Sequence, residues 1–565
     1  MESLTKIQIA EQEKVHKEFL ESNLPRMDRD ILVEEIMLPS WDGVKLRTIL
    51  YRPVEKNVFP TVVVRTSYPQ EDHIYRATAE EYCKAGFAYI YQYCRGVGGS
   101  EGVWEPNVNE RADGKSFIDW VCGQNWVGNV GYLGNSYLAL TGWCIADIVP
   151  EKVKTMYLTH YGTQRHTSAF MDGMFRHDVL TAWTMRCAGQ PIFASFYESC
   201  KYRPHKQVDT DLWGVSLDWY RDWICASDRT DSYWRHGFWN MLRDVPGRVK
   251  IPLFIGEGWF DHHLGSAIET YQLLSEESKK HSVFCIGGWD HRSNLCTAYH
   301  PNINARNTNR KNALEWFYQI LVQENIPDGR IDSYVVGSDT WISHNYRDTI
   351  SRKSKILYFS KEVGYQGAYR LSKKRQDEML EFSYIYDPAD PVISHGAESL
   401  LFETDKIGSL LQPQPNYRGD VISFESDVFD VDTTIFGRPQ VHLSVSTDVD
   451  DTAFSVKIME VSPDGKAYNI RTGITSLAYR NQSDVRLSYT PKDKVQIVID
   501  TWDIAWTIHQ GCRIRVDISS SDFPQYAIHS NFAGKWEEQT RERIAHQIIY
   551  VGGSQSSYLE LPVLE

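Results

Sequence analysis

Continuous apolar segments alternate with amphipathic segments in the first third of the chain, and this alternation limits the folds open to it more than any other feature. Phe59–Tyr68 (FPTVVVRTSY) and Phe87–Tyr93 (FAYIYQY) have the composition of strands that are buried on both faces. Tyr75–Gly86 and Asn109–Gln124 have helical periodicity instead, and Gly86 is suited to end the first of these helices. Buried strands that alternate with helices predict an α/β fold with a parallel sheet.

The rest of the chain divides into regions of different character. Its 565 residues are too many for a single core. Residues 1–30 predict an N-terminal helical extension, and the alternating pattern covers residues 31–160 and returns over residues 249–349. Residues 161–248 are helical and aromatic, whereas residues 350–565 consist of short alternating strands separated by turn signals. We therefore expect an α/β domain with an inserted helical segment, followed by a C-terminal β-sandwich or jelly roll.

Charge and composition limit the expected partners and the expected location. A formal net charge of −14 predicts that the chain repels phosphate backbones, so nucleic acid is not expected to bind. No apolar run approaches the ~18 residues that cross a bilayer, and charges interrupt the N-terminus where a secretory signal would be apolar. The ten cysteines form no C-x-x-C pair and no dense ligand cluster. This favours reduced thiols, a cytoplasmic location, and a site without metal or cofactor. A homodimer is left open.

Two serines compete for the role of a nucleophile. Ser100 lies in a literal G-x-S-x-G pattern, which marks a nucleophile elbow when a strand precedes it and a helix follows it. The residues after Ser100 contain Gly102 and Pro106, where that helix should begin. Ser136 has the expected context, because a strand leads into it and an apolar helical run continues to about Val149. We therefore predict Ser136 as the nucleophile.

The elbow at Ser136 departs from the usual pattern at one position. Leu138 stands where the second glycine belongs, so its side chain needs room that a glycine would not. We expect Leu138 to point into the sheet and pack beneath the turn. Without activity, the same segment would be an ordinary strand-to-helix turn with a capping serine.

A catalytic triad in this fold follows a fixed order along the chain: the serine first, then an aspartate or glutamate, then a histidine. The acid is therefore expected after Ser136. Asp261 comes directly after the apolar strand Ile251–Gly258 and is the predicted acid. Glu257 competes for this role but lies within or beside the end of the strand. Asp290 also competes, although it is too close in sequence to the predicted histidine to present its carboxylate to the ring.

The histidine of the triad is expected at the end of the strand that follows the acid in the chain. His291 follows the strand His281–Trp289 and is the predicted general base. His262 and His263 come directly after the acid, where local loop contacts are expected, and His281 lies at the wrong end of its strand. The predicted triad is therefore Ser136, Asp261 and His291.

Seven stretches of the sequence resemble one group of serine hydrolases, that of cocaine esterase, α-amino-acid ester hydrolase and X-prolyl dipeptidyl aminopeptidase. The resemblance extends over nearly the whole chain, with departures such as Tyr93 and Cys94 before Arg95, where the group usually has an aspartate, and Asn125, where proline is usual. The stretches are RTSYP, CRGVGGSEGVW, ERADGKSFIDWVCGQNWVGNVGYLGNSY, GWFD, GGWDH, YDPADPV and FPQYAIHSN.

The resemblance implies an α/β-hydrolase domain, with residues 161–248 as a helical cap and residues 350–565 as a C-terminal jelly roll. It also implies that Ser100 is structural, in a loop that Arg95 and Glu101 hold in place. For the oxyanion hole, the backbone N–H of the residue after the nucleophile, Tyr137, is the first expected donor. The resemblance suggests the hydroxyl of Tyr68 as the second donor; otherwise Tyr68 would be an aromatic side chain packed at a strand end.

These residues predict acyl transfer from a small-molecule ester or amide through an acyl-enzyme. An acyltransferase could use the same triad with an amine or alcohol acceptor. An aminopeptidase would need carboxylates for a substrate ammonium group, for which Asp172 and Asp178 are weak candidates. A non-catalytic binding protein with a degenerate elbow is the remaining alternative. Tryptophans in the predicted cap could line an acyl pocket, but helix packing accounts for most of them: Trp183, Trp213, Trp219, Trp223, Trp234 and Trp239.

Overall fold

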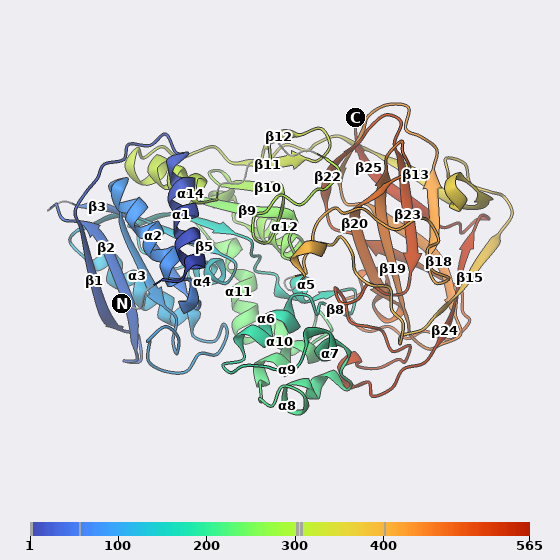
Figure 1. Ribbon diagram of the computed structural model, residues 1–565, viewed down its shortest axis with the longest axis horizontal. Coiled ribbons are helices and arrows are strands. Elements are labelled where there is room, and N and C mark those ends of the chain that lie inside the picture. Colours follow the sequence, from blue (N-terminus) through green and yellow to red (C-terminus); the bar gives the residue numbers. More distant parts are fainter. Residues whose placement is uncertain (1–3, 56–57, 301–303, 306–308, 401–402) are drawn as a thin grey trace.

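The computed structural model describes residues 4–55, 58–300, 304–305, 309–400 and 403–565. The N-terminal α/β part and the C-terminal β-rich part lie at opposite ends of the molecule, and a group of short helices lies between them along one side (Figure 1). This arrangement confirms the predicted α/β class with a C-terminal β-rich part.

Ten strands of the described chain form one central sheet, in the order β1-β2-β4-β3-β5-β6-β9-β10-β11-β12. Neighbouring strands from β4 to β11 are parallel, as predicted. The edges of the sheet differ, because β1, β2 and β12 pair antiparallel with their neighbours. Edge hairpins need only short connections, whereas parallel neighbours need crossovers. The strands are β1 (Ile31–Pro39), β2 (Lys45–Pro53), β3 (Phe59–Thr66), β4 (Ala88–Tyr93), β5 (Val127–Asn135), β6 (Val153–Thr159), β9 (Leu253–Phe260), β10 (Val283–Asp290), β11 (Arg330–Val335) and β12 (Thr340–Asn345).

Helices cover both faces of this sheet. Along β3, Val63 belongs to one buried apolar cluster and its neighbours Val62 and Val64 belong to another, as the alternation of side chains along a strand requires. One face packs against α1 (Lys6–Leu20), α2 (Asp72–Lys84) and α14 (Asn309–Phe317), and the other packs against α3 (Glu110–Gly123), α4 (Tyr137–Trp143) and α12 (Leu264–Leu273).

The α4 helix is shorter than the sequence predicts. The apolar run suggested a helix to about Val149, but α4 ends at Trp143 and turns follow. Gly142 lies in its last turn, where a Cβ atom would come within 2.7 Å of Leu158. The apolar residues beyond the helix, such as Ile145, are buried as turn residues, so hydrophobicity alone could not mark where the helix ends.

A largely helical segment connects β6 to β9, and a short hairpin interrupts it. Aromatic side chains pack its helices together, among them Trp183 stacked on Trp223 with 5.8 Å between ring centroids. No described helix has both the length and the apolar character needed to cross a membrane. The elements are α5 (Arg165–Ala169), β7 (Phe170–Met171), β8 (Met174–Phe175), α6 (Leu180–Cys187), α7 (Phe196–Lys201), α8 (Val208–Asp211), α9 (Asp218–Cys225), α10 (Ser232–Arg235) and α11 (Gly237–Asp244).

The C-terminal part is built from strands that pair antiparallel, except that β14 and β16 pair parallel. Alternate residues of these strands, such as Val441, Leu443 and Val445, point into a common core. The strands are β13 (Arg352–Val363), β14 (Tyr369–Ser372), β15 (Leu380–Tyr386), β16 (Ile422–Ser426), β17 (Thr433–Gly437), β18 (Gln440–Thr447), β19 (Ala453–Val461), β20 (Ala467–Ser476), β21 (Val495–Asp500), β22 (Ile504–Ile508), β23 (Arg513–Ser519), β24 (Ala545–Val551) and β25 (Tyr558–Leu564).

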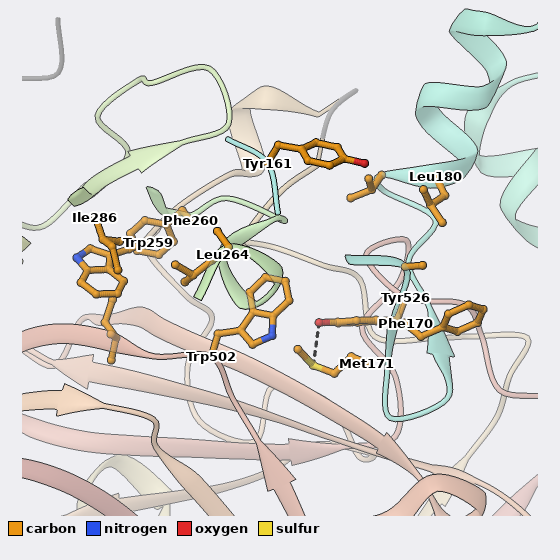
Figure 2. Close-up of a cluster of buried hydrophobic side chains, with 14 of the residues drawn as sticks. Tyr161, Phe170, Met171, Leu180, Trp259, Phe260, Leu264, Ile286, Trp502 and Tyr526 are labelled. Carbon is orange, nitrogen blue, oxygen red and sulfur yellow. Dashed lines mark hydrogen bonds between the residues drawn. The ribbon is translucent and has the colours of Figure 1, made fainter. Parts of the chain in front are cut away.

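Buried aromatic side chains join the β-rich part to the loop after β9 (Figure 2). Trp502 packs so closely over α12 that a Cβ atom on Gly265 would lie 2.5 Å from its indole nitrogen. Arg471, which is fully buried, donates a 2.6 Å hydrogen bond to the backbone carbonyl of Trp259 in β9. Tyr526 donates to the sulfur of Met171 at 3.1 Å. The β-rich part therefore supports the end of β9.

Candidate active site

Ser136 lies at the sharp turn between β5 and α4. Its backbone has φ 56° and ψ −125°, a strained conformation for a residue with a side chain. Gly134 is required two residues earlier, because a Cβ atom there would lie 2.3 Å from the carbonyl oxygen of Leu138. The strand, the strained turn and the helix together match the geometry of a nucleophile elbow.

Leu138 does not crowd this turn. Its side chain is half-buried and packs against the apolar cluster on the sheet face covered by α1, α2 and α14. Position 138 therefore tolerates a large side chain, because that side chain contacts the core and not the strained backbone of Ser136.

Replacing Leu138 with glycine is expected to destabilise the protein. The change removes apolar contacts and places a glycine in the first turn of a helix, which together should cost about 2 kcal/mol of unfolding free energy. Thermal or urea unfolding measures this cost. Leu273→Gly, at a half-exposed position in the last turn of α12, is a matched control that should destabilise the protein less. A Leu138→Gly protein that is more stable than the wild type would instead mean that Leu138 strains the turn.

The structure brings Ser136, His291 and Asp261 together in a continuous hydrogen-bonded series. The distance from His291 Nε2 to Ser136 Oγ is 3.0 Å, and the distance from His291 Nδ1 to Asp261 Oδ2 is 2.8 Å. Asp261 follows β9 and His291 follows β10, and these parallel strands are neighbours in the sheet. The backbone N–H of His263 donates to Asp261 Oδ1 at 2.7 Å, which fixes the orientation of the carboxylate.

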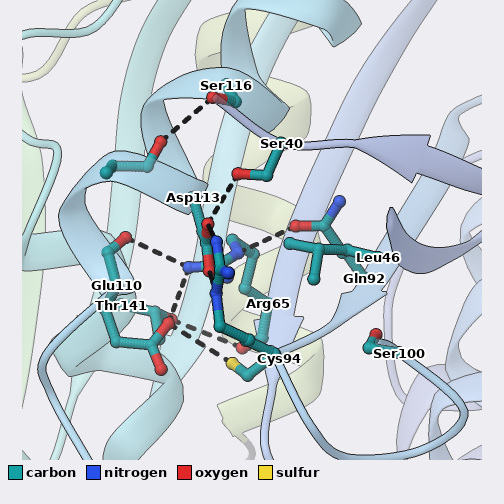
Figure 3. Close-up of polar contacts among 12 residues, drawn as sticks. Ser40, Leu46, Arg65, Gln92, Cys94, Ser100, Glu110, Asp113, Ser116 and Thr141 are labelled. Carbon is teal, nitrogen blue, oxygen red and sulfur yellow. Dashed lines mark hydrogen bonds and ion pairs between the residues drawn. The ribbon is translucent and has the colours of Figure 1, made fainter. Parts of the chain in front are cut away.

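Ser100 is not part of this series. Its hydroxyl donates to the carbonyl of Tyr93 at 3.0 Å and accepts the backbone N–H of Arg47 at 2.9 Å. Figure 3 shows Ser100 away from the buried polar residues of this region. Arg95 holds the same loop through ion pairs with Asp42 and Asp113, and the Glu101 carboxylate accepts the backbone N–H of Lys45. Both hydrogen bonds of Ser100 therefore attach its loop to the backbone of β2 and β4.

Two competing acids have other partners. Asp290 Oδ1 accepts the backbone N–H groups of Arg292 at 2.8 Å and Asn294 at 2.9 Å, so this carboxylate caps the turn that presents His291. Glu257 is fully buried within β9, and its Oε1 accepts the N–H of Gly258 at 3.0 Å.

The competing histidines also have local partners. Burial lowers the pKa of both His262 and His263 well below the usual range, and neighbouring positive groups act in the same direction, so both rings are neutral. Their Nδ1 atoms lie within hydrogen-bond distance of hydroxyl groups outside the series, whereas His281 is exposed. The contacts are His262 with Ser399 at 3.1 Å, His263 with Ser168 at 2.8 Å, and His281 with the carbonyl of Pro327 at 3.0 Å.

His160 is a site residue that sequence reasoning missed. Its Nδ1 lies 2.7 Å from Asp261 Oδ2, the same oxygen that His291 contacts, and its Nε2 lies 2.9 Å from the hydroxyl of Ser293. It also lies 3.6 Å from Glu257 Oε1. The sequence shows only that His160 directly follows a predicted strand; the sheet of the folded protein makes that strand, β6, the neighbour of β9.

Electrostatics favour a charged His160 beside an ionised Asp261. Burial lowers the pKa of His160, but the carboxylates of Asp261 and Glu257 outweigh burial and raise it to about 10. Burial raises the pKa of Asp261, but the neighbouring histidines hold it well below its usual range. Burial and the charge of Asp261 raise the pKa of Glu257.

The stability of the protein is therefore expected to fall as the pH rises from about 7 to 10. A histidine whose pKa is raised on folding, from 6.5 to about 10, stabilises the folded state fully below 6.5, and this contribution is lost as the pH rises through 10. Melting temperatures of the wild type and His160→Gln across this range test the prediction, with the half-exposed His344→Gln as the control. An unchanged pH dependence in His160→Gln would contradict it.

His160, Asp261 and His291 are also the group of described residues whose geometry could hold a metal ion, since their ligand atoms lie within 4.8 Å of one another. In the structure these atoms contact one another directly, and Asp261 Oδ2 accepts from both imidazoles. A metal ion would have to replace both contacts.

Tyr68 and Tyr137 lie together beside the elbow. The hydroxyl of Tyr68 accepts the indole N–H of Trp183 at 3.2 Å, which leaves its own proton to donate, and burial raises its pKa so that this proton is retained. The backbone N–H of Tyr137 is at the first position of α4, where backbone N–H groups have no partner within the helix. The Tyr137 side chain points away from solvent and donates to Glu110 at 2.9 Å.

Glu110, which accepts the hydrogen bond of Tyr137, belongs to a buried ion-pair network (Figure 3). Arg65 is completely buried and donates to the Glu110 carboxylate at 2.7 Å, while its Nε donates to Gln92 at 3.0 Å. The carboxylate of Asp113 lies 3.8 Å from Arg65 and 2.7 Å from Arg95. The network therefore connects the loop of Ser100 to the elbow of Ser136.

An elbow serine after a central parallel strand, with a histidine and an aspartate after later strands, defines the chain as a serine hydrolase of the α/β type. Residues 42–293 match the model of the X-Pro dipeptidyl-peptidase (S15) family, and residues 330–560 match that of the X-Pro dipeptidyl-peptidase C-terminal non-catalytic domain. The chain belongs to this family, which confirms the resemblance predicted from the sequence.

Known proteins are similar to this chain over nearly its full length. Cocaine esterase from Rhodococcus sp. (strain MB1 Bresler) is 25% identical over 589 residues, which cover 94% of this chain and 99% of the esterase. An aminopeptidase from the marine sediment archaeon Thaumarchaeota archaeon has a TM-score of 0.79 at 20% identity, covering 96% of this chain and 99% of its own. An α-amino acid ester hydrolase has a TM-score of 0.76 at 21% identity, covering 95% and 97%. The two structures establish a shared fold.

Proposed function

We propose that this serine hydrolase cleaves a small-molecule ester or amide through an acyl-enzyme, with Ser136 as nucleophile, His291 as general base and Asp261 as the orienting acid. The observation that carries the proposal is the 3.0 Å contact between Ser136 Oγ and His291 Nε2, in series with the 2.8 Å contact between His291 Nδ1 and Asp261. This geometry lets the imidazole take the serine proton as Oγ attacks.

The reaction then follows from the positions of these groups. Ser136 Oγ bonds to the carbonyl carbon while its proton moves to His291, and the N–H of Tyr137 and the hydroxyl of Tyr68 donate to the developing oxyanion. The tetrahedral species expels the alcohol or amine, which takes the proton from His291. Water, deprotonated by His291, attacks the acyl-enzyme and releases the acid and free Ser136.

The chain division predicted from the sequence is part of the proposal. Residues 161–248 would act as a cap over the α/β-hydrolase domain of residues 31–160 and 249–349, with residues 1–30 as an extension and residues 350–565 as a jelly roll. The stacking of Trp183 on the Tyr137 ring, with centroids 5.9 Å apart, supports a cap whose aromatic side chains face the nucleophile.

An ester or amide is favoured because the similar proteins are a cocaine esterase and an α-amino acid ester hydrolase. The similar aminopeptidase makes peptidase activity a second candidate. The two acids considered for ammonium binding give it little support, since Asp178 is fully buried beside Arg176 at 3.4 Å and burial raises the pKa of Asp172 to about 7. Transfer of the acyl group to an amine or alcohol in place of water would use the same three residues.

A fluorophosphonate probe is expected to label Ser136 and to leave Ser100 unlabelled. The probe reacts with a serine whose hydroxyl a neighbouring base deprotonates, and only Ser136 of these two contacts an imidazole. Peptide mapping of the labelled protein identifies the site, and Ser100→Ala should label as the wild type does. Label on Ser100, or no label on folded wild-type protein, would contradict the proposed nucleophile.

A further inference from the structure

A cavity lies among the helices of the inserted segment, apart from the residues proposed for catalysis. Its volume is ≈ 510 Å³, within the range of small-molecule sites. Residues of α5, α10 and α11 line it together with Leu273 from α12, whereas Ser136, His291 and Tyr68 do not. Two of its walls are the indole rings of Trp234 and Trp239.

The charge of this cavity is opposite to that of the whole chain. Four arginines line it, whereas the acidic lining consists of Asp244 alone, in a protein whose net charge is −14. Existing ion pairs account for two of these arginines: Arg243 lies 3.4 Å from Asp244, and Arg229 lies between Glu269 and Asp484 at 3.6 and 3.4 Å. The remaining two carry the uncompensated charge.

Arg165 is the most unusual of the four. It is only 9% exposed, yet no carboxylate among the described residues lies within 4.0 Å of its guanidinium, and its Nε has no hydrogen-bond partner there. Its Cζ atom lies over the rings of Trp223 and Tyr161, 5.1 and 6.0 Å from the ring centroids. These contacts leave the N–H groups at the edge of the guanidinium for hydrogen bonding. A buried charge without a counter-ion is costly, so an anion that enters the cavity would relieve this cost.

Arg235 adds a second charge at the same cavity. Its Nε donates to the carbonyl of Arg229 at 3.1 Å, and in the part of the chain that the structure describes it too has no carboxylate within 4.0 Å. The backbone contact holds the side chain in place and leaves its positive charge unpaired.

We propose that this cavity binds an organic anion, an aromatic carboxylate whose charge pairs with Arg165 and Arg235 and whose ring packs against Trp234 and Trp239. Arginine is suited to this role because its planar N–H groups match a carboxylate in two parallel hydrogen bonds. The tryptophans supply the apolar contact that a bare inorganic anion would not use.

Calorimetric titration of the full chain with 1-naphthoate tests the proposal. We expect one molecule to bind, 1-naphthamide to bind at least about 10-fold more weakly, and inorganic phosphate to bind more weakly than 1-naphthoate. Arg165→Gln and Arg235→Gln should each weaken 1-naphthoate binding about 10-fold, whereas the exposed control Arg347→Gln should leave it unchanged. If Arg165→Gln does not fold, Arg235→Gln alone decides, because its side chain is only partly buried.

Covalent labelling of Ser136 shows whether 1-naphthoate binds in this cavity or in the proposed active site. Protein labelled with fluorophosphonate at Ser136 should bind 1-naphthoate as tightly as unlabelled protein. Loss of binding on labelling would place the ligand in the active site and overturn the proposal. No binding of 1-naphthoate to wild-type protein, equal binding of the amide, or unchanged binding in the folded arginine variants would overturn it as well.

Discussion

Replacing His291 with alanine is expected to lower kcat on a phenyl ester by roughly 10⁴–10⁶-fold. Among the described residues, His291 is the imidazole within hydrogen-bond distance of Ser136 Oγ, at 3.0 Å, so the variant loses the group that takes the serine proton. The protein should stay folded, because His160 still pairs with the Asp261 carboxylate when the His291 ring is removed. Steady-state rates and a melting curve of the same preparation provide both measurements.

The three histidines that competed in the sequence are the natural controls. His262→Ala, His263→Ala and His281→Ala should keep most of the activity, because their Nδ1 atoms form hydrogen bonds with groups outside the proposed triad. His262 Nδ1 is also near Asp261 Oδ1, but at 3.6 Å it is beyond hydrogen-bond distance. His262 and His263 are buried, so rates are compared only for variants that remain folded. A loss that follows His262, with His291→Ala still active, would contradict the proposed base.

The residues of this site could be predicted because each follows a strand. The carboxyl ends of parallel neighbours meet at one edge of a sheet, so Asp261 after β9 and His291 after β10 had to lie close together. Ser136 could be separated from Ser100 by the helix that follows it. β9 and β10 are also consecutive strands of the chain, and consecutive strands are often neighbours in a sheet.

His160 could not be found by the same reasoning because it depended on strand order. Its strand, β6, precedes β9 by nearly a hundred residues, and only the sheet order makes the two neighbours. A parallel sheet with crossover connections permits several orders for the same strands. The sequence also did not reveal the antiparallel edges. β1 and β12 are partly exposed, so polar residues interrupt the continuous apolar runs that mark the buried parallel strands.

The support that the β-rich part gives to the site was also beyond prediction. Arg471 is more than two hundred residues from Trp259, the backbone of which it contacts at 2.6 Å. Neither residue carries a sequence pattern that identifies its partner. Such contacts follow from the packing of two finished sheets and not from local propensity.

Replacing Asp261 with asparagine is expected to lower kcat by roughly 10⁴-fold at neutral pH. An amide nitrogen in place of the carboxylate oxygen would donate toward His291 Nδ1 and favour the tautomer whose Nε2 carries a proton. That tautomer cannot take the proton of Ser136. The fluorophosphonate labelling rate should fall in parallel, since it depends on the same proton transfer.

Matched replacements of the other two acids test whether Asp261 acts by orienting the His291 ring or only by its negative charge. Glu257→Gln and Asp290→Asn each remove a carboxyl group near the site, but Asp290 caps a turn and Glu257 contacts the backbone of Gly258. Both should keep kcat within about 10-fold of the wild type, because neither touches the ring of His291. If Glu257→Gln is as inactive as Asp261→Asn, the acid has been misassigned between these neighbours.

The second histidine gives Asp261→Asn a consequence beyond catalysis. Asp261 Oδ2 accepts from His160 at 2.7 Å as well as from His291 at 2.8 Å, so the asparagine also removes the main partner of a buried, charged imidazole. The pKa of His160 should fall, and the loss of stability between pH 7 and 10 should become smaller. His160→Gln should show the same reduced pH dependence while keeping Ser136, His291 and Asp261 in contact. The activity would then depend on His291 and the pH dependence of stability on His160, although both imidazoles hydrogen-bond to the same oxygen, Asp261 Oδ2.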